Sequence, residues 1–265
     1  MRNLSIVGRI FFGIAIAGIG FLTIYYSDFP YMLIPPEHSW IPAREMLAYI
    51  SGAMLILAGA CIVFEIRIKS VSLLLGSVLL LIFCLYFIPY EFMASSNYMH
   101  LLDWENAEKE LALAGGAFVM AGFHSKKNEA SLHWYLEKLI PFGAILFAIP
   151  IISFGILHFI YAKDVSDYVP SWIPNRLLWT YLAGIGLFGS GLAIILKIKP
   201  ELTAALLGTM IFIWFVILHI PRVIVSPVAY RGSEITSAFL ALAYCGISFV
   251  ISGANKKQPA NQRFV

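Results

Sequence analysis

The sequence predicts an all-α membrane protein with eight transmembrane helices, arranged as two tandem four-helix bundles of the same orientation. Three observations predict this fold class: an apolar composition, eight apolar runs of membrane-spanning length, and an internal repeat. Hydrophobic residues make up 60% of the 265 residues and charged residues only 12%, about half the charged share of a soluble domain. We therefore expect the chain to lie in a lipid bilayer.

The apolar runs are expected to be helices, because about 20 helical residues cross about 30 Å of hydrocarbon and no alternating barrel pattern competes with them. The expected spans are residues 7–26, 46–64, 70–90, 107–123, 139–161, 178–196, 202–220 and 235–252, of which the fourth is the shortest. The first run is expected to remain as a span and not to be a cleaved secretory signal. Its A-x-A match, Ala15-Ile16-Ala17, lies inside the apolar run and not after it.

Basic residues predict which side of the membrane each loop faces. With the N-terminus inside, 12 of the 18 lysines and arginines lie on the cytoplasmic side and the remaining 6 on the other side. The positive-inside rule therefore predicts a multi-pass protein of the cell (inner) membrane with both termini cytoplasmic. The net charge of +3 is too small to indicate a nucleic-acid partner.

An internal repeat divides the chain into two halves. Trp40-Ile41-Pro42 recurs 132 residues later as Trp172-Ile173-Pro174. The same offset pairs Arg44 with Arg176, Tyr49 with Tyr181, Gly52 with Gly184, Gly59 with Gly191, Gly76 with Gly208 and Pro89 with Pro221, while residues 111–114 match 240–243 at an offset of 129. A unit with an even number of crossings keeps its orientation when it is duplicated. We expect a first repeat at 1–123, a cytoplasmic linker at 124–138, a second repeat at 139–253 and a cytoplasmic tail at 254–265.

Motifs of soluble enzymes are not found in the sequence. It contains no nucleophile elbow, phosphate loop, HExxH or haem-attachment CxxCH motif. Cys61, Cys84 and Cys245 lie inside apolar spans without CxxC spacing, so neither a disulfide framework nor a zinc site is expected. The sequence gives no indication of a catalytic residue or of a bound metal, and it leaves open whether the protein is an enzyme.

One candidate site stands out in the second repeat. His158 and His219 lie near the ends of the fifth and seventh spans, and at about 1.5 Å per residue both are roughly 26 to 28 Å from the inner end. We expect His158, His219 and Arg222 to line one outer-leaflet pocket, with Tyr181, Trp172 and Trp179 as further walls. The first repeat has Thr23, Phe87 and Tyr90 at the corresponding positions. In the alternative, structural interpretation each histidine donates to a helix-end carbonyl and Arg222 anchors the headgroup boundary.

A family resemblance is carried by three stretches of the second half. Phe154-Gly155-Ile156-Leu157-His158-Phe159, Val169-Pro170-Ser171-Trp172-Ile173-Pro174 and Trp179-Thr180-Tyr181-Leu182-Ala183-Gly184 resemble DoxX-like membrane proteins. The resemblance implies a four-helix unit and a link to quinone-dependent sulfur oxidation, through the DoxD and DoxX subunits of a thiosulfate:quinone oxidoreductase. The first half departs from the pattern, with Thr23 in place of the histidine and residues 35–39 before Trp40.

Three functions are compatible with these observations. The first is a quinone-binding, redox-linked component with a site near the outer leaflet, acting alone or beside an oxidoreductase, with haem held by the two histidines as the alternative to quinone. The second is a non-enzymatic scaffold or assembly subunit of a larger membrane complex. The third is a small-molecule transporter, which is disfavoured because no span carries a paired ionisable residue near the bilayer midplane.

Overall fold

The computed structural model describes residues 2–34, 42–93, 102, 104–123, 134–226 and 232–253. Within these ranges every regular element is helical. Seven helical segments are long and apolar enough to cross a membrane: Asn3–Tyr25, Arg44–Val63, Ile68–Met93, Trp134–Ile160, Arg176–Ile195, Pro200–Val225 and Ser233–Ser252. The protein is therefore an all-α, multi-pass membrane protein whose apolar helices contact lipid.

The described helices follow one another along the chain. In the first half they are α1 (Arg2–Tyr25), α2 (Arg44–Val63), α3 (Ile68–Ile82), η1 (Phe83–Phe87), α4 (Ile88–Met93) and α5 (Glu105–Phe123). In the second half they are α6 (Trp134–Glu137), η2 (Ile140–Phe142), α7 (Gly143–Ile160), α8 (Ala162–Ser166), α9 (Arg176–Ile195), α10 (Pro200–Trp214), η3 (Phe215–His219), α11 (Ile220–Val225) and α12 (Ser233–Ser252). The third and seventh expected spans are thus composite helices, each with a π-helical turn between two α-helical parts.

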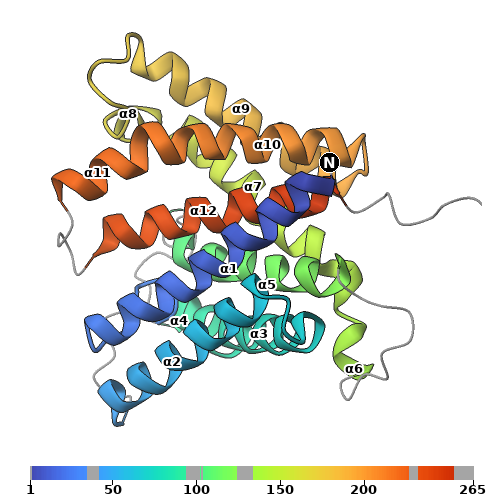
Figure 1. The fold of residues 1–265 in the computed structure, drawn as a ribbon. Coiled ribbons are helices and arrows are strands. Elements are labelled where there is room, and N and C mark those ends of the chain that lie inside the picture. The colour runs from blue at the N-terminus through green and yellow to red at the C-terminus, as the bar shows by residue number, and fades with distance from the viewer. Residues whose placement is uncertain are drawn as a thin grey trace, which may run out of the picture.

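The helices of the two halves pack on each other. α1 packs on α2 and on α12, and α12 packs in turn on α10 and α5. α5 packs on α3 and α7, and α7 packs on α9. Figure 1 shows α1 and α12, which come from opposite ends of the chain, lying side by side through the middle of the molecule. α12 is the most enclosed of the seven apolar segments, since 83% of its 18-residue apolar window is buried.

Glycines permit two close backbone approaches between the halves. A Cβ atom added at Gly8 would meet the carbonyl oxygen of Gly246, and one added at Gly246 would meet that of Gly8. Gly115 of α5 and Gly143 of α7 face each other in the same way. Small residues let helix backbones approach closely inside a membrane, where apolar burial gives little driving force. These glycine contacts therefore fix the α1–α12 and α5–α7 pairs.

The π-helical turns have a local cause in the prolines that follow them. Pro89 and Pro221 have no backbone N–H, so neither can donate to the carbonyl four residues earlier. In the turn before each proline, the N–H of Ile88 bonds to the oxygen of Phe83 and the N–H of Ile220 to that of Phe215, five residues back. The two turns lie 132 residues apart, which is also the offset between the bounds of α2 and α9.

Some expected features differ from the structure or lie outside the described residues. α5 carries four charged residues at its start, Glu105, Glu108, Lys109 and Glu110, and is not among the seven apolar segments. The described end of the expected linker, residues 134–138, contains the short helix α6, tied to α3 by an ion pair of 2.7 Å between Lys69 Nζ and Glu137 Oε1. Trp40, Ile41 and the expected tail at 254–265 lie outside the described residues.

Candidate functional site

A cavity of about 720 Å³ lies among α7, α9, the α10–η3–α11 helix and α12, with residues of α5 in its wall. Its volume is in the range of small-molecule sites. His158, His219 and Arg222 all line it, so the cavity brings together the three residues that the sequence predicts in one pocket.

The cavity is polar at one end and apolar at the other. Near the end of α7 and the start of α9 its wall contains His158, Asp164 and Thr180. Deeper in the bundle the same helices contribute Ile151 and Leu187. The composite helix and α12 follow the same order, with His219, Arg222 and Glu234 at the polar end and Met210, Ile211, Trp214, Ala241 and Tyr244 deeper. An amphipathic ligand therefore matches this cavity better than a uniformly polar one.

His158 is held by its own helix. Its Nδ1 lies 2.7 Å from the carbonyl oxygen of Phe154. A carbonyl oxygen only accepts hydrogen bonds, so Nδ1 carries the hydrogen. The Cβ atom of His158 packs against Gly184, where an added Cβ would approach it to 2.9 Å. His158 thus makes the helix-carbonyl bond of the structural interpretation and also lines the cavity.

His219 is the last residue of the π-helical turn η3, and its side chain is half-buried. Its Nδ1 is buried and has no hydrogen-bond partner among the described residues. An unpaired buried nitrogen costs about 1 to 3 kcal/mol, and His219 is one of the residues that line the cavity. A polar atom of a ligand would offset that cost.

Arg222 is engaged with a partner that the sequence analysis missed. Its Nε donates to Oε2 of Glu234 at 2.7 Å, and its Nη2 donates to Oε1 of the same carboxylate. The guanidinium also lies over the ring of Tyr168, 4.5 Å from its centroid. Arg222 therefore joins α11 to the first turn of α12. The signal that could have revealed Glu234 is its position as an isolated acid at the start of an apolar span, 12 residues after Arg222.

Trp172, Trp179 and Tyr181 do not line the cavity. Their exposed fractions are 71%, 44% and 37%, and Tyr181 stacks on Phe159 with ring centroids 5.8 Å apart. The face of α9 that meets the cavity is Thr180, Ala183 and Leu187, so the helical rotation of about 100° per residue turns the neighbours of Thr180 away. The aromatic walls are instead Phe154, Tyr161, Tyr168, Trp214 and Tyr244.

The first half is packed where the second half is open. Thr23, which corresponds to His158, is fully buried and donates its hydroxyl to the oxygen of Ile19 at 2.8 Å. Phe87, which corresponds to His219, is also fully buried. A smaller cavity of about 340 Å³ lies beside the loop that follows α1. The two halves therefore differ most at the predicted site.

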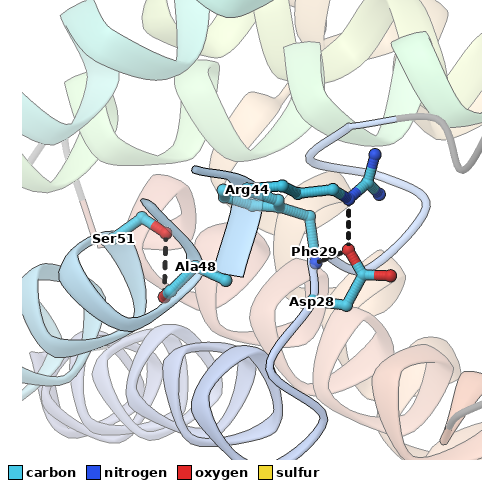
Figure 2. Close-up of polar contacts among 5 residues, drawn as sticks. All are labelled: Asp28, Phe29, Arg44, Ala48 and Ser51. Carbon is cyan, nitrogen blue, oxygen red and sulfur yellow. Dashed lines mark hydrogen bonds and ion pairs between the residues drawn. The ribbon is translucent and has the colours of Figure 1, made fainter. Parts of the chain in front are cut away.

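An ion pair closes the loop after α1 in the first half. Figure 2 shows Arg44 reaching from the start of α2 to Asp28, with 2.6 Å between Nε and Oδ1. The same oxygen accepts the backbone N–H of Phe29 at 2.8 Å. In Figure 2, Ser51 lies further along α2 and bonds to the carbonyl of Ala48 within its own helix. Asp28 lines the smaller cavity and Arg44 fixes its position.

The two cavities are neighbours. Lys109, Ser233, Ser237 and Leu240 line both, so the starts of α5 and α12 separate them. The Nζ atom of Lys109 lies 2.6 Å from Oε1 of Glu105 and donates to Oδ1 of Asn106 at 3.4 Å. The charge of Lys109 is therefore balanced within α5.

Within the described ranges no three histidine, cysteine, aspartate or glutamate side chains gather closely enough to hold a metal ion. The groups that line the cavity include two imidazoles, two partly buried ion pairs and hydroxyl groups. No protein-family model, curated protein or solved structure matches this chain, so the site is interpreted from its own residues.

Proposed function

We propose that this protein binds a lipid-soluble ring compound of the quinone class in the larger cavity, as a redox-linked membrane component beside an oxidoreductase. The observation that carries the proposal is one cavity with two imidazoles from different helices at its polar end and an apolar remainder. Imidazole nitrogens suit the ring oxygens of such a compound, and the apolar part suits its hydrocarbon tail. The resemblance to DoxX-like proteins points to the same class.

The charges of the cavity favour a neutral ligand. Arg222, which we expected to line the pocket, has two of its donors bound to Glu234. Lys109 is paired with Glu105. An anionic ligand would have to displace a carboxylate from a cation that it already binds. A neutral ring compound leaves both ion pairs intact.

The proposal includes eight crossings, with α5 as the eighth. Ser5 of α1 lies against Gly253 beyond α12, and Gly18 lies against Phe239, so α1 and α12 are antiparallel. If the start of the first helix and the end of the last helix lie on the same side of the membrane, the chain crosses it an even number of times. The seven apolar segments alone give an odd number. α5, with 19 residues, is about 28 Å long. Its charged first turns then lie at the membrane boundary.

We also propose that the two halves are like-oriented copies of one unit, with both termini cytoplasmic and the polar end of the cavity in the outer leaflet. The equal offsets between the bounds of α2 and α9, and between the two π-helical turns, support a duplication. The unit does not pack by itself, because α1–α2 lie on α12 and α7 lies on α5.

Mass spectrometry of the purified full chain with its native lipids tests the function. A stoichiometric isoprenoid quinone or quinol is expected, and a double variant, His158→Leu with His219→Leu, should lose it. Trp172→Phe and Tyr181→Phe serve as matched controls that should retain it, because these side chains lie outside the cavity. A stoichiometric protein partner without any quinone would contradict the proposal and favour an assembly subunit. A haem absorption band that disappears in the double variant would show that the ligand of the two histidines is haem and not quinone.

A further inference from the structure

We infer that the cavity selects the reduced, hydroxyl-bearing form of the ring compound, because His158 and Thr180 present it with a wall of hydrogen-bond acceptors. The inference rests on the proposed function and names which member of the quinone–quinol pair is bound. It follows from the hydrogen bonds that these two side chains already donate to backbone carbonyl oxygens of their own helices.

The imidazole of His158 offers only an acceptor to the cavity when the ring is neutral. Its single hydrogen is on Nδ1, which lies 2.7 Å from the oxygen of Phe154, an atom that can only accept. The remaining nitrogen, Nε2, then carries a lone pair and no hydrogen. A ring hydroxyl can donate to that lone pair, whereas a ring carbonyl cannot.

Thr180, on the neighbouring helix α9, also presents only acceptor lone pairs to the cavity. Its side chain is 1% exposed, and Oγ1 donates its only hydrogen to the oxygen of Arg176 at 3.1 Å. The lone pairs of Oγ1 are what remain for a ligand in the cavity that Thr180 lines. Thr180 lies one turn before Gly184, the residue against which His158 packs. The acceptors of α7 and α9 therefore belong to one wall.

The two cationic side chains in the wall that could donate to a carbonyl, Arg222 and Lys109, are paired with carboxylates. Arg222 donates Nε and Nη2 to Glu234, and the ammonium of Lys109 is bound by Glu105. His219 imposes no preference of its own, because its Nδ1 has no partner among the described residues and nothing fixes its tautomer. His158 and Thr180 therefore supply the preference that we infer, because the hydrogen of each is held by its own helix. The carbonyl oxygens of a quinone would face the acceptor atoms of His158 and Thr180 without a hydrogen between them. The hydroxyl groups of a quinol could donate to both residues.

The test compares three probes on the full chain in lipid nanodiscs: a decyl-substituted benzoquinol under anaerobic conditions, the matching benzoquinone, and the quinol with both hydroxyls methylated. Quenching of tryptophan fluorescence reports binding, because Trp214 lines the cavity; a Trp214→Phe variant identifies its part of the signal. We expect the quinol to bind at least about tenfold more tightly than either other probe, since a site built to hydrogen-bond a hydroxyl rejects analogues without it.

Variants of the acceptor wall separate its two members. Thr180→Val removes the acceptor with little change of shape and should reduce the preference for the quinol about threefold to tenfold, whereas Thr180→Ser should preserve it. Thr209→Val is the matched control: Thr209 also donates to its own helix, to Ala205 at 2.8 Å, but is exposed and does not line the cavity. His158→Leu should abolish the preference, and His158→Gln, which retains an acceptor oxygen, should restore part of it.

The outcomes test the preference for the quinol separately from the proposed binding of a quinone-class compound. If the quinone binds as tightly as the quinol, or if Thr180→Val and His158→Leu leave the preference unchanged, the acceptor wall is refuted while the quinone-class site stands. If none of the three probes binds, both proposals are refuted. A preference for the quinol that depends on His158 and Thr180 but not on Thr209 supports the inference.

Discussion

Arg9 is buried at the end of α2, although the charge pattern places it on the cytoplasmic side as a topology signal. Its Nη1 donates to the carbonyl oxygens of Ile62 at 2.9 Å and Val63 at 2.6 Å, and its Nη2 lies 3.1 Å from Oε1 of Glu65. The last carbonyls of a helix have no partners within it, so Arg9 caps α2 and ties it to α1. A basic side chain in that position also interacts favourably with the helix dipole.

We predict that Arg9→Met lowers the free energy of unfolding by about 2 kcal/mol, because the buried carbonyls of Ile62 and Val63 lose a charged donor. Thermal unfolding in detergent should show a decrease in Tm of several degrees. Lys163→Met is the matched control, since Lys163 is exposed on α8. Equal melting of the two variants would show that the capping bonds contribute nothing.

Glu110 differs from Arg9, because it is a buried charged residue type for which the described residues provide no hydrogen-bond partner. Its side chain is fully buried in α5, and neither carboxyl oxygen has a hydrogen-bond partner among the described residues. Burial of an unpaired polar group is destabilising, and an apolar side chain of similar shape removes that cost. We therefore predict that Glu110→Met raises the free energy of unfolding by about 1 to 3 kcal/mol. A decrease in Tm for this variant would contradict the prediction and show that the carboxyl group is stabilised in the folded protein.

The π-helical turn η3 determines which way His219 points. Pro221 cannot donate to the carbonyl of Ile217, so the chain accommodates one extra residue before it. We predict that Pro221→Ala lets the helix return to α-helical bonding and turns His219 by about 100° relative to the helix after it. Bound quinone or quinol, measured by mass spectrometry, should fall about tenfold.

Pro89→Ala is the control for this change. It alters the corresponding turn, η1, in the half where fully buried Phe87 stands in place of His219. This variant should keep its bound ligand. If both proline variants retain the ligand equally, the turn does not position His219.

The sequence predicts the long helices well because a membrane imposes their length. The expected spans 178–196 and 235–252 differ from α9 and α12 by at most two residues at either end. The short helices α6 and α8 were not predicted, because they contain too few residues to show a period and depend on contacts such as Lys69–Glu137. The same rise per residue places His158 and His219 at one depth, and both line the larger cavity.

The rotation of each helix about its axis was harder to predict than its depth. α9 carries apolar residues on all sides, since lipid and protein interior are equally apolar. Nothing in the sequence therefore shows that Thr180 faces the cavity while Trp179 and Tyr181 face outward. The Arg222–Glu234 pair was missed for a related reason, because it joins two spans across a loop and follows no helical spacing.

The pairing of helices across the two halves is a property of the whole molecule that the repeat does not determine. Each unit could bury its apolar faces within itself or against the other unit, and hydrophobicity does not choose between these arrangements in lipid. The choice is made by shape, where Gly8 meets Gly246 and Gly115 meets Gly143. As a result α5 and α12 become the central helices, and each contributes charged residues to the wall of the larger cavity.

This arrangement leads to a prediction about topology that depends on α5. The first turns of α1 lie beside the end of α12. We therefore predict that both termini lie on one side of the membrane and that α5 crosses it, which gives an even number of crossings. In a background without Cys61, Cys84 and Cys245, single cysteines at Ser96, before α5, and at Ser171, between α8 and α9, should react with an impermeant maleimide added to intact cells. A cysteine at Asn128, after α5, should react only after the membrane is permeabilised. The same accessibility at Ser96 and Asn128 would mean that α5 does not cross, and a reversal of all three sites would place the termini outside and invert the positive-inside assignment.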